Sequence, residues 1–179
     1  MPKELIVRNA READDLMAIV RTSARRAQEW MSAQSDDPLA LLRRMKFDQV
    51  GFHPLEGRPL NLIEQVNQTR TFAVAITAAR QLLVLHPDAG GLRLAPGAHA
   101  SLELDIMSEV EGYVGAETFA VVSPRNNGKL AADLAKLARR SERYRYIFFM
   151  SPLFPSMSAG RNSSGTESRC GQSISDAGE

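Results

Sequence analysis

The chain has 179 residues, of which 44% are hydrophobic and 24% are charged, a balance that supports a packed apolar core without disulfides or bound metal. Its 22 basic and 21 acidic residues give a formal net charge of +1, which excludes a global attraction to nucleic acid or membranes, so DNA binding would need a local basic patch. Cys170 is the only cysteine, which excludes an internal disulfide and a cysteine-based zinc site, and the three histidines lack the spacing of zinc ligands.

Two helices are predicted in the N-terminal part of the chain. Apolar residues recur at spacings of three and four between Asn9 and Gln34, which is the pattern of an amphipathic helix. The sequence Asp36-Asp37-Pro38 then provides the acids and the proline that are typical of a helix start. Leu39, Leu42 and Met45 are expected to form the apolar side of this short second helix.

The rest of the chain is predicted to run in the order helix, three strands, helix, strand. After a turn-rich loop at residues 51–59, a long helix begins with Asn61 as its N-cap and ends at His86-Pro87. The alternation of apolar and polar residues then changes to the period of strands. The expected strands are residues 92–94, 101–107 and 113–122, followed by a helix over residues 127–140 and a deeply buried strand, Tyr144–Met150.

These elements predict one α/β domain over residues 1–157, in which residues 1–58 are a helical extension and residues 59–157 form the core. The four strands are expected to form a four-stranded mixed sheet flanked by helices. From Ser158 to Glu179 the composition turns to serine, glycine and polar residues. Such residues bury too little to offset an ordering entropy of roughly 1–2 kcal/mol per residue. We therefore expect residues 158–179 to be a disordered tail that is dispensable for folding.

Two charged residues break local rules in the core. Glu117 lies in an otherwise apolar strand, and Lys129 opens a helix, where the free N–H groups and the helix dipole disfavour a cation. Strand alternation puts Glu117 on the same side as Phe119 and Val121, and it puts Asp105 opposite the apolar side of its own strand. If these two strands pair, the two carboxylates converge.

Converging carboxylates point to a cation site. Two carboxylates held close together repel each other unless a cation or a proton offsets their charge. Mg²⁺ binds one or two protein carboxylates together with waters and phosphate oxygens. A metal ion held by Asp105 and Glu117 would orient water towards a phosphodiester and neutralise the charge that develops on it.

The order of the elements, together with these acids, resembles the PD-(D/E)xK nuclease superfamily, which has the restriction-endonuclease-like fold. The resemblance covers about residues 61–150. In that family an aspartate ends one strand, a Glu-x-Lys lies on the next strand, and an acid on the first core helix often assists. The resemblance therefore implies Asp105, Glu117 and Glu64 as Mg²⁺ ligands.

The sequence departs from the family pattern at two positions. Asp105 follows Leu104 instead of a proline, and Phe119 stands where the family has its lysine. Some members supply the lysine from the following helix, and the resemblance gives that role to Lys129, in the polar segment Asn126-Asn-Gly-Lys-Leu130. The implied function is a divergent Mg²⁺-dependent nuclease acting on DNA phosphodiesters, with Asp105, Glu117 and Lys129 as catalytic residues.

Each of these residues also has a structural alternative. Glu64 fits a helix-capping box. Lys129 lies four residues before Asp133, the spacing of a helical ion pair. The position of Asp105 is also that of a residue that caps the end of a strand, and Glu117 is compatible with an ion pair to an arginine of a neighbouring helix.

Two other functions stay open. A catalytically degenerate member of the same fold would bind nucleic acid or a protein partner, and Phe119 favours this alternative. A helical interaction protein would form a homodimer through the N-terminal stripe, with Met17, Trp30 and Met31 exposed. Two basic clusters would contact DNA phosphates or would simply be solvated helix faces: Arg21, Arg25, Arg26, Arg43, Arg44 and Lys46, and Arg139, Arg140, Arg143 and Arg145.

Membrane association is not expected. The longest apolar run is far shorter than the roughly 20 residues that span a bilayer, and no signal-like segment follows Met1. A cytoplasmic location is therefore the expectation.

Overall fold

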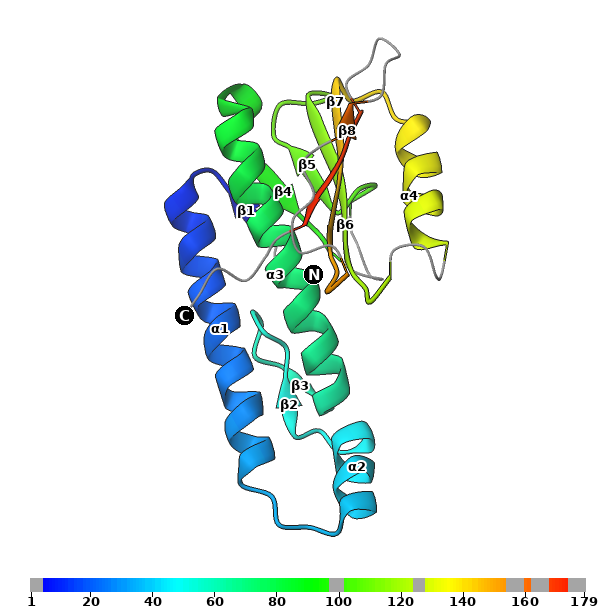
Figure 1. The fold of residues 1–179 in the computed structure, drawn as a ribbon. Coiled ribbons are helices and arrows are strands. Elements are labelled where there is room, and N and C mark those ends of the chain that lie inside the picture. Colours follow the sequence, from blue (N-terminus) through cyan, green and yellow to red (C-terminus); the bar gives the residue numbers. More distant parts are fainter. Residues whose placement is uncertain (1–4, 97–101, 124–127, 154–159, 162–167, 174–179) are drawn as a thin grey trace.

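A mixed β-sheet with helices on both faces forms the body of the protein, and a helical arm extends from it (Figure 1). The computed structural model describes residues 5–96, 102–123, 128–153, 160–161 and 168–173. This architecture confirms the predicted α/β class. The α-helices of the described residues are α1 (Ala10–Ser32), α2 (Pro38–Phe47), α3 (Leu62–Leu85) and α4 (Lys129–Ala138), and a 3-10 turn, η1 (Pro87–Ala89), follows α3.

The sheet has a five-stranded mixed body in the order β1-β4-β5-β6-β7. Neighbouring strands are antiparallel except β6 and β7, which run parallel and are connected through α4. The predicted order helix, three strands, helix, strand is present as α3, β4, β5, β6, α4 and β7. The strands of this body are β1 (Leu5–Val7), β4 (Leu92–Leu94), β5 (Ile106–Ser108), β6 (Val114–Ala120) and β7 (Tyr144–Met150).

The sheet is larger than the predicted four strands. The short strand β1 adds to β4, and β9 (Ser168–Ser173) and β8 (Gly160–Arg161) extend the sheet beyond β7 to seven strands. Disorder was predicted for residues 158–179, and the other residues of that segment lie outside the described part of the chain. An open sheet edge pairs with a further strand through backbone groups, whatever side chains that strand carries, so composition did not reveal β8 and β9.

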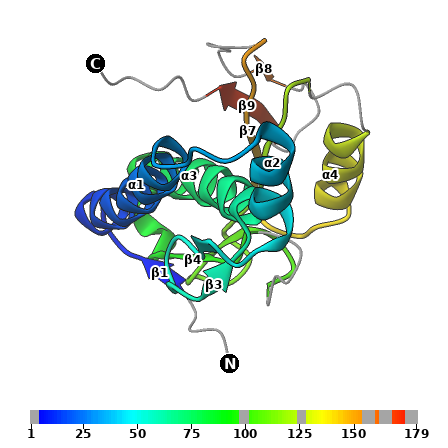
Figure 2. The ribbon, with the colours of Figure 1, turned by 90° about the horizontal axis from the view of Figure 1, so that it is seen from below.

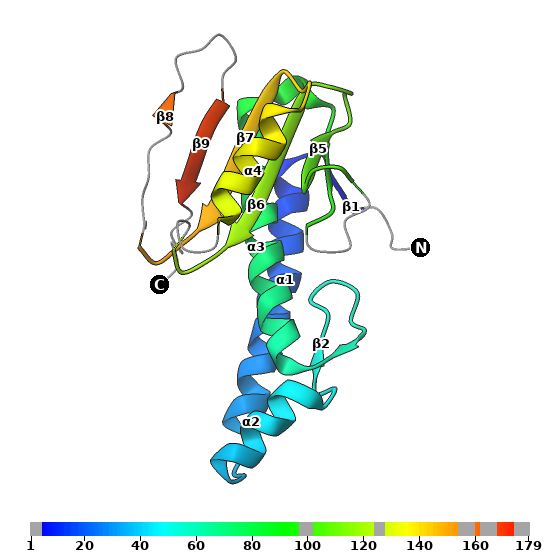
Figure 3. The same ribbon diagram turned by 90° about the vertical axis from the view of Figure 1, so that its right-hand side faces the viewer.

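Two helices cover opposite faces of the sheet. Figure 3 shows α4 in front of β6 and β7, with α3 behind them. Tyr146 and Phe148 of β7 belong to the larger apolar core on the α3 side, whereas Ile147 and Phe149 belong to a smaller cluster with Leu137 of α4. Because both faces of β6 and β7 are covered, these strands are apolar on both sides, as parallel strands usually are.

The arm consists of α1 packed along α3, with α2 at its far end (Figures 1 and 2). The apolar stripe predicted on α1 is the face that packs on α3, with Ala13, Val20 and Ala27 buried. The apolar stripe that was proposed as a dimer surface therefore packs against α3 of the same chain. The Trp30 ring lies beneath the guanidinium of Arg44, with 5.3 Å between the Arg44 Cζ and the ring centroid.

A buried glutamine ties the arm together. The Gln65 side chain of α3 donates to the carbonyl and the hydroxyl of Ser23 on α1, both at 2.9 Å, and accepts from the backbone N–H of Phe52 at 3.1 Å. Phe52 belongs to a two-stranded hairpin of β2 (Gly51–Phe52) and β3 (Pro59–Leu60), in the segment that was predicted to be a loop. The strands are two residues long, too short for a periodic signal.

The orientation of α2 differs from the expectation. Leu39, Leu42 and Met45 were predicted to form its apolar side, but Leu39 and Leu42 are 77% and 59% exposed, and only Met45 of the three is half-buried. No residue of α2 is fully buried. The half-buried side is formed by Leu41, Arg44 and Met45. In the part of the chain that the structure describes, no helix combines the length and the apolar character needed to cross a membrane.

Candidate functional site

Asp105 and Glu117 face each other where the pairing of β5 with β6 ends. The last paired residues are Ile106 and Ala116, so Asp105, which directly precedes β5, comes opposite Glu117. The Oδ2 atom of Asp105 accepts hydrogen bonds from the backbone N–H of Thr118 at 2.8 Å and from its hydroxyl at 3.0 Å. Asp105 therefore also ends the strand pairing with its side chain, the structural role that the sequence left open.

Glu117 lies on the α4 side of the sheet, as strand alternation predicted. Phe119 and Val121, its predicted neighbours on that side, belong to the apolar cluster under α4. Gly115 leaves room at the same face, because a Cβ there would clash with Leu104 and lie 3.1 Å from the Cγ of Glu142. The Glu117 side chain is only 2% exposed, so its carboxylate needs a cation close by.

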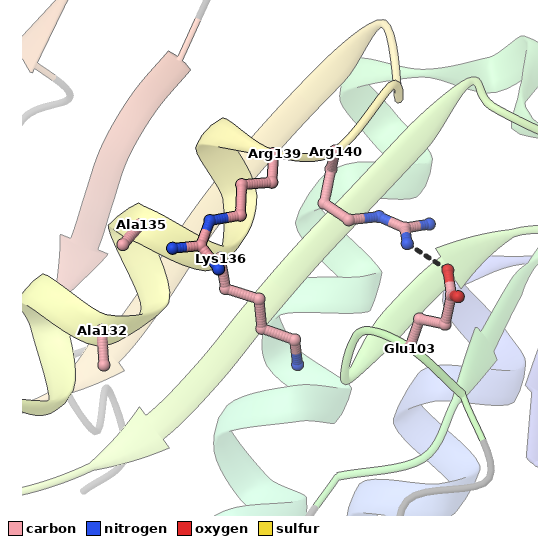
Figure 4. Close-up of a pocket in the computed structure, with 6 residues that line it drawn as sticks. All are labelled: Glu103, Ala132, Ala135, Lys136, Arg139 and Arg140. Atoms are coloured by element: carbon pink, nitrogen blue, oxygen red, sulfur yellow. Dashed lines mark hydrogen bonds and ion pairs between the residues drawn. The ribbon is translucent and has the colours of Figure 1, made fainter.

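Lys136 of α4 supplies that cation. Its Nζ lies 2.5 Å from Oε1 of Glu117, and its own side chain is 48% exposed. Figure 4 shows Lys136 leaving α4 and reaching over β6. The sequence allowed an arginine from a neighbouring helix as the partner of Glu117, and the structure places a lysine there.

Lys129 is the first residue of α4 and pairs with Asp133. Gly128, with φ at 67°, adopts the left-handed conformation that lets the helix begin at Lys129. The Lys129 Nζ lies 2.7 Å from Oδ1 of Asp133, whose side chain is 5% exposed. The other carboxylate oxygen of Asp133 is buried without a hydrogen-bond partner among the described residues. The helical ion pair considered from the sequence is therefore present.

The electrostatics join these pairs into one cluster. Burial raises the pKa of Glu117 above its ordinary value, the hydrogen bond from Lys136 opposes this, and the charges of Asp105 and Asp133 add to the rise. Burial also raises the pKa of Asp105, against the hydrogen bonds from Thr118. Burial lowers the pKa of Lys129, but Asp133, Glu117 and Asp105 together bring it above its ordinary value. Lys129 is thus within electrostatic reach of both predicted metal ligands.

Phe119 fills the position at which the family pattern has a lysine. Its ring is 7% exposed and stacks on Phe149 of β7, with the ring centroids 5.6 Å apart. The Nζ of Lys129 lies 5.9 Å from the centroid of the Phe119 ring. The floor of the site is therefore apolar, and its cations come from α4.

Glu64 is not brought to this cluster. It follows the N-cap Asn61, whose Oδ1 accepts from the backbone N–H of Glu64 at 2.8 Å, so Glu64 has the capping role that the sequence also allowed. The start of α3 lies beside α2, beyond the edge of the sheet (Figures 1 and 3). Within the described ranges, no three histidine, cysteine, aspartate or glutamate side chains are grouped closely enough to hold a metal ion.

Sequence reasoning missed Lys136 and the burial of Asp133. A signal for both was present, because Lys129, Asp133, Lys136 and Arg140 follow one another at spacings of four, three and four. Residues at these spacings share one side of a helix. A row of three cations and one acid along one side of the predicted helix was therefore visible in the sequence, although the sequence does not show that this side faces the carboxylates.

Comparisons with protein-family models, curated proteins and solved structures found no match to this chain. Inferences about function therefore rest on the order of the elements and on the geometry of this cluster.

Proposed function

We propose that the protein is a divergent nuclease of the PD-(D/E)xK type, which hydrolyses DNA phosphodiesters with the help of a divalent metal ion. The order α3, β4, β5, β6, α4, β7 supports this proposal, as do the parallel pairing of β6 with β7 and the helices on opposite faces of the sheet. The fold alone does not specify chemistry. The proposal therefore depends on the side chains at the end of β5 and β6.

The observation that carries the proposal is that the register of β5 with β6 puts the two acidic residues opposite each other. Asp105 and Glu117 come from adjacent strands and face each other beneath two lysines of α4. Two acids with lysines beside them would position a phosphodiester and stabilise the charge that builds on it during hydrolysis. Two acids held side by side in a buried position repel each other, which raises their free energy unless a cation or a proton offsets it.

The donor set fits Mg²⁺. Two carboxylates are enough when waters and phosphate oxygens complete the coordination, whereas an all-protein cage would need more acids than the cluster provides. Asp105 and Glu117 are the residues that would hold the ion, and Glu64 is too remote to be a third ligand. A bound divalent ion would activate water and neutralise negative charge on the phosphate.

The remaining residues have distinct roles in this proposal. Thr118 fixes the orientation of Asp105 through two hydrogen bonds to one carboxylate oxygen, which leaves the second oxygen for a ligand. Lys136 holds Glu117 and offers its ammonium to a phosphate oxygen. Asp133 holds Lys129 at the entrance of the site. Phe119 keeps the floor apolar, which strengthens electrostatic interactions above it.

The test is cleavage of mixed single- and double-stranded DNA with Mg²⁺ or Mn²⁺, comparing the unaltered protein with Glu117→Gln and Asp105→Asn. We expect both variants to lose cleavage by a factor of about 10² or more, the scale of one preorganised electrostatic group. Glu64→Gln is the matched control and should keep full activity. Equal activity in Glu117→Gln, or equal losses in all three variants, would contradict the assignment.

A second candidate is a catalytically degenerate member of the same fold that binds nucleic acid without cleaving it. The packing of Phe119 against Phe149 at the family's lysine position favours this candidate. DNA binding by the unaltered protein, combined with no metal-dependent cleavage of any substrate, would select it over the nuclease.

A further inference from the structure

A second feature lies directly beside the carboxylates, an open pocket of about 520 Å³ between α4 and Glu103 of the segment before β5. Three of its six lining residues are cations and one is an acid (Figure 4). Lys136 belongs both to this pocket and to the ion pair with Glu117, so the pocket and the candidate site are adjacent. The lining residues are Glu103, Ala132, Ala135, Lys136, Arg139 and Arg140.

Arg140 is fixed in place by a buried acid. Its Nε lies 3.2 and 3.1 Å from the two carboxylate oxygens of Glu142, and its Nη2 lies 2.6 Å from Oε1 of the same residue. The Glu142 side chain is only 2% exposed. The Arg145 guanidinium donates to the backbone carbonyl of Arg140 at 2.6 Å, which anchors the chain at this point. The guanidinium is therefore preorganised, with its Nη1 directed into the pocket.

The anion that meets this Nη1 is Glu103, which is held only weakly. Its side chain is 70% exposed, and Arg140 is its only ion-pair partner among the described residues (Figure 4). Exposed ion pairs contribute little, because water competes for both charges. A phosphate group offers more acceptor oxygens and more charge than this carboxylate, and it forms charge-assisted hydrogen bonds with a guanidinium in a fixed orientation.

Arg139 adds a cation that no acid neutralises. Its side chain makes no hydrogen bond or ion pair within the described residues, and it leaves the end of α4 in the direction opposite to Arg140. Cations near a helix C-terminus also interact favourably with the helix dipole, which accounts for a positive charge there. The dipole does not account for the pairing of Arg140 with the exposed carboxylate of Glu103, which a ligand can replace. Nor does it account for Arg139, which has no acidic partner among the described residues.

We propose that this pocket binds a phosphate group of a nucleic-acid strand, next to the phosphodiester held by the carboxylates, and that Glu103 occupies it when no phosphate is bound. The inference rests on the proposed function for its substrate. Arg140 binds the flanking phosphate in place of Glu103, and Lys136 lies between that phosphate and Glu117. Arg139, on the other side of Lys136, adds a further positive charge for the phosphates of the same strand (Figure 4). Glu103 competes with the phosphate for Arg140, so it weakens binding.

The test measures binding without divalent metal, by the fluorescence anisotropy of a labelled oligonucleotide added to the full chain. We expect Arg139→Gln to bind about 3–10 times more weakly and to lower the slope of log affinity against log salt by about one, the effect of removing one phosphate contact. We expect Glu103→Gln to bind about 3–10 times more tightly, because the competing acid is gone. Arg11→Gln on α1, outside both basic clusters, and Glu64→Gln on α3 are the matched controls for each change of charge.

Two further arms identify the source of the phosphate. Oligonucleotides with and without a 5′-phosphate distinguish a terminal from an internal group. Inorganic phosphate alone should shift the Arg140 side-chain Nε–H signal in NMR spectra, and Glu103→Gln should enhance this shift. Equal affinities in Glu103→Gln and Glu64→Gln, equal losses in Arg139→Gln and Arg11→Gln, or no binding by the unaltered chain would each overturn the proposal.

The two proposals fail in different ways. If pocket variants change binding as expected but no cleavage depends on Glu117, the phosphate pocket stands and the nuclease does not. If cleavage depends on Glu117 while the pocket variants bind like their controls, the nuclease stands and the pocket proposal is wrong.

Discussion

At the scale of single residues, we expect stability to be most sensitive to substitutions in the ion pair between Glu117 and Lys136. Glu117 is buried, and Lys136 is its cationic partner at 2.5 Å. Lys136→Met should destabilise the protein by about 1–3 kcal/mol at neutral pH, because it leaves a buried carboxylate without a counter-charge. The measurement is urea unfolding of a double-mutant cycle with Glu117→Gln. The double variant should recover most of the loss, and additive losses would contradict the pair.

Lys129 has a similar dependence on its partner. Asp133 is nearly inaccessible, and one of its oxygens has no hydrogen-bond partner among the described residues, so Lys129→Met should leave the acid buried without its ion-pair partner. We expect a lower melting temperature for Lys129→Met and recovery in Lys129→Met/Asp133→Asn. Metal-dependent cleavage should stay low in both variants if Lys129 acts in the site. A variant that melts earlier but cleaves normally would reduce Lys129 to a structural residue.

The lowered pKa of Glu142 predicts how the unfolding free energy changes with pH. The hydrogen bond from Arg140 lowers the pKa of Glu142 below its ordinary value of 4.5, although burial opposes this. A lowered pKa in the folded state means that ionised Glu142 stabilises the fold above about pH 4.5, and that this stability is lost as the pH falls through the folded pKa. The difference in unfolding free energy between the unaltered protein and Glu142→Gln should therefore shrink from pH 6 to pH 3. A constant difference would contradict the shift.

Much of the site was predictable from the sequence, but the side of α4 that faces the carboxylates was not. Strand alternation correctly predicted the side on which Glu117 lies with Phe119 and Val121. The expected strand over residues 101–107 is observed only as Ile106–Ser108, and Leu104 and Ile106, expected on one side, belong to different apolar clusters. Asp105 lies in a bend just before β5, and the register of Ile106 with Ala116 brings it opposite Glu117. Lys136 was missed because it lies 19 positions after Glu117, and only the packing of α4 brings it back to β6. Glu64 was assigned wrongly to the cluster because a sequence does not show how far a long helix extends past its sheet.

At the scale of elements, β7 separates the two layers of the core. Phe148 packs on the α3 side and is 4% exposed, so Phe148→Ala should destabilise the protein by about 3–5 kcal/mol. Val84→Ala is the control, because Val84 is 71% exposed and should change stability little. Chemical denaturation of both variants is the measurement. A small effect of Phe148→Ala would show that the interior of the sheet tolerates a cavity there.

The helices were predictable as elements, as was the three-residue strand β4, observed at the predicted residues 92–94, whereas the short strands β1, β2 and β3 were not predicted. The predicted helix over residues 127–140 is observed as Lys129–Ala138, and the first helix, predicted between Asn9 and Gln34, is observed as Ala10–Ser32. Helices of this length repeat their apolar pattern several times, whereas β1 has three residues and β2 has two. The face of α2 was also misjudged, because a ten-residue helix offers two apolar sides and the sequence does not say which one packs.

At the scale of the whole molecule, the arm and the sheet should differ in local stability. α2 has no fully buried residue, whereas every residue of β6 from Val114 to Phe119 is buried. Regions with few buried contacts open at lower free energy than a core strand. Hydrogen exchange should therefore be about 10² times faster or more at the amides of α2 than in β6. Phe148→Ala should accelerate exchange in β6 and leave α2 unchanged, and equal protection of both would contradict independent opening.

The pairing of the edge strand β1 with β4 has a consequence for folding during synthesis. Leu5 of β1 pairs with Leu94 of β4, so almost ninety further residues are synthesised after β1 before its partner strand exists. At about 5–20 residues per second, that interval lasts roughly 4–18 seconds. During this time α1 and α2 are already synthesised, but the apolar segment Leu5–Val7 has no sheet to join. The apolar segment of β1 is therefore without its partner strand for several seconds during synthesis.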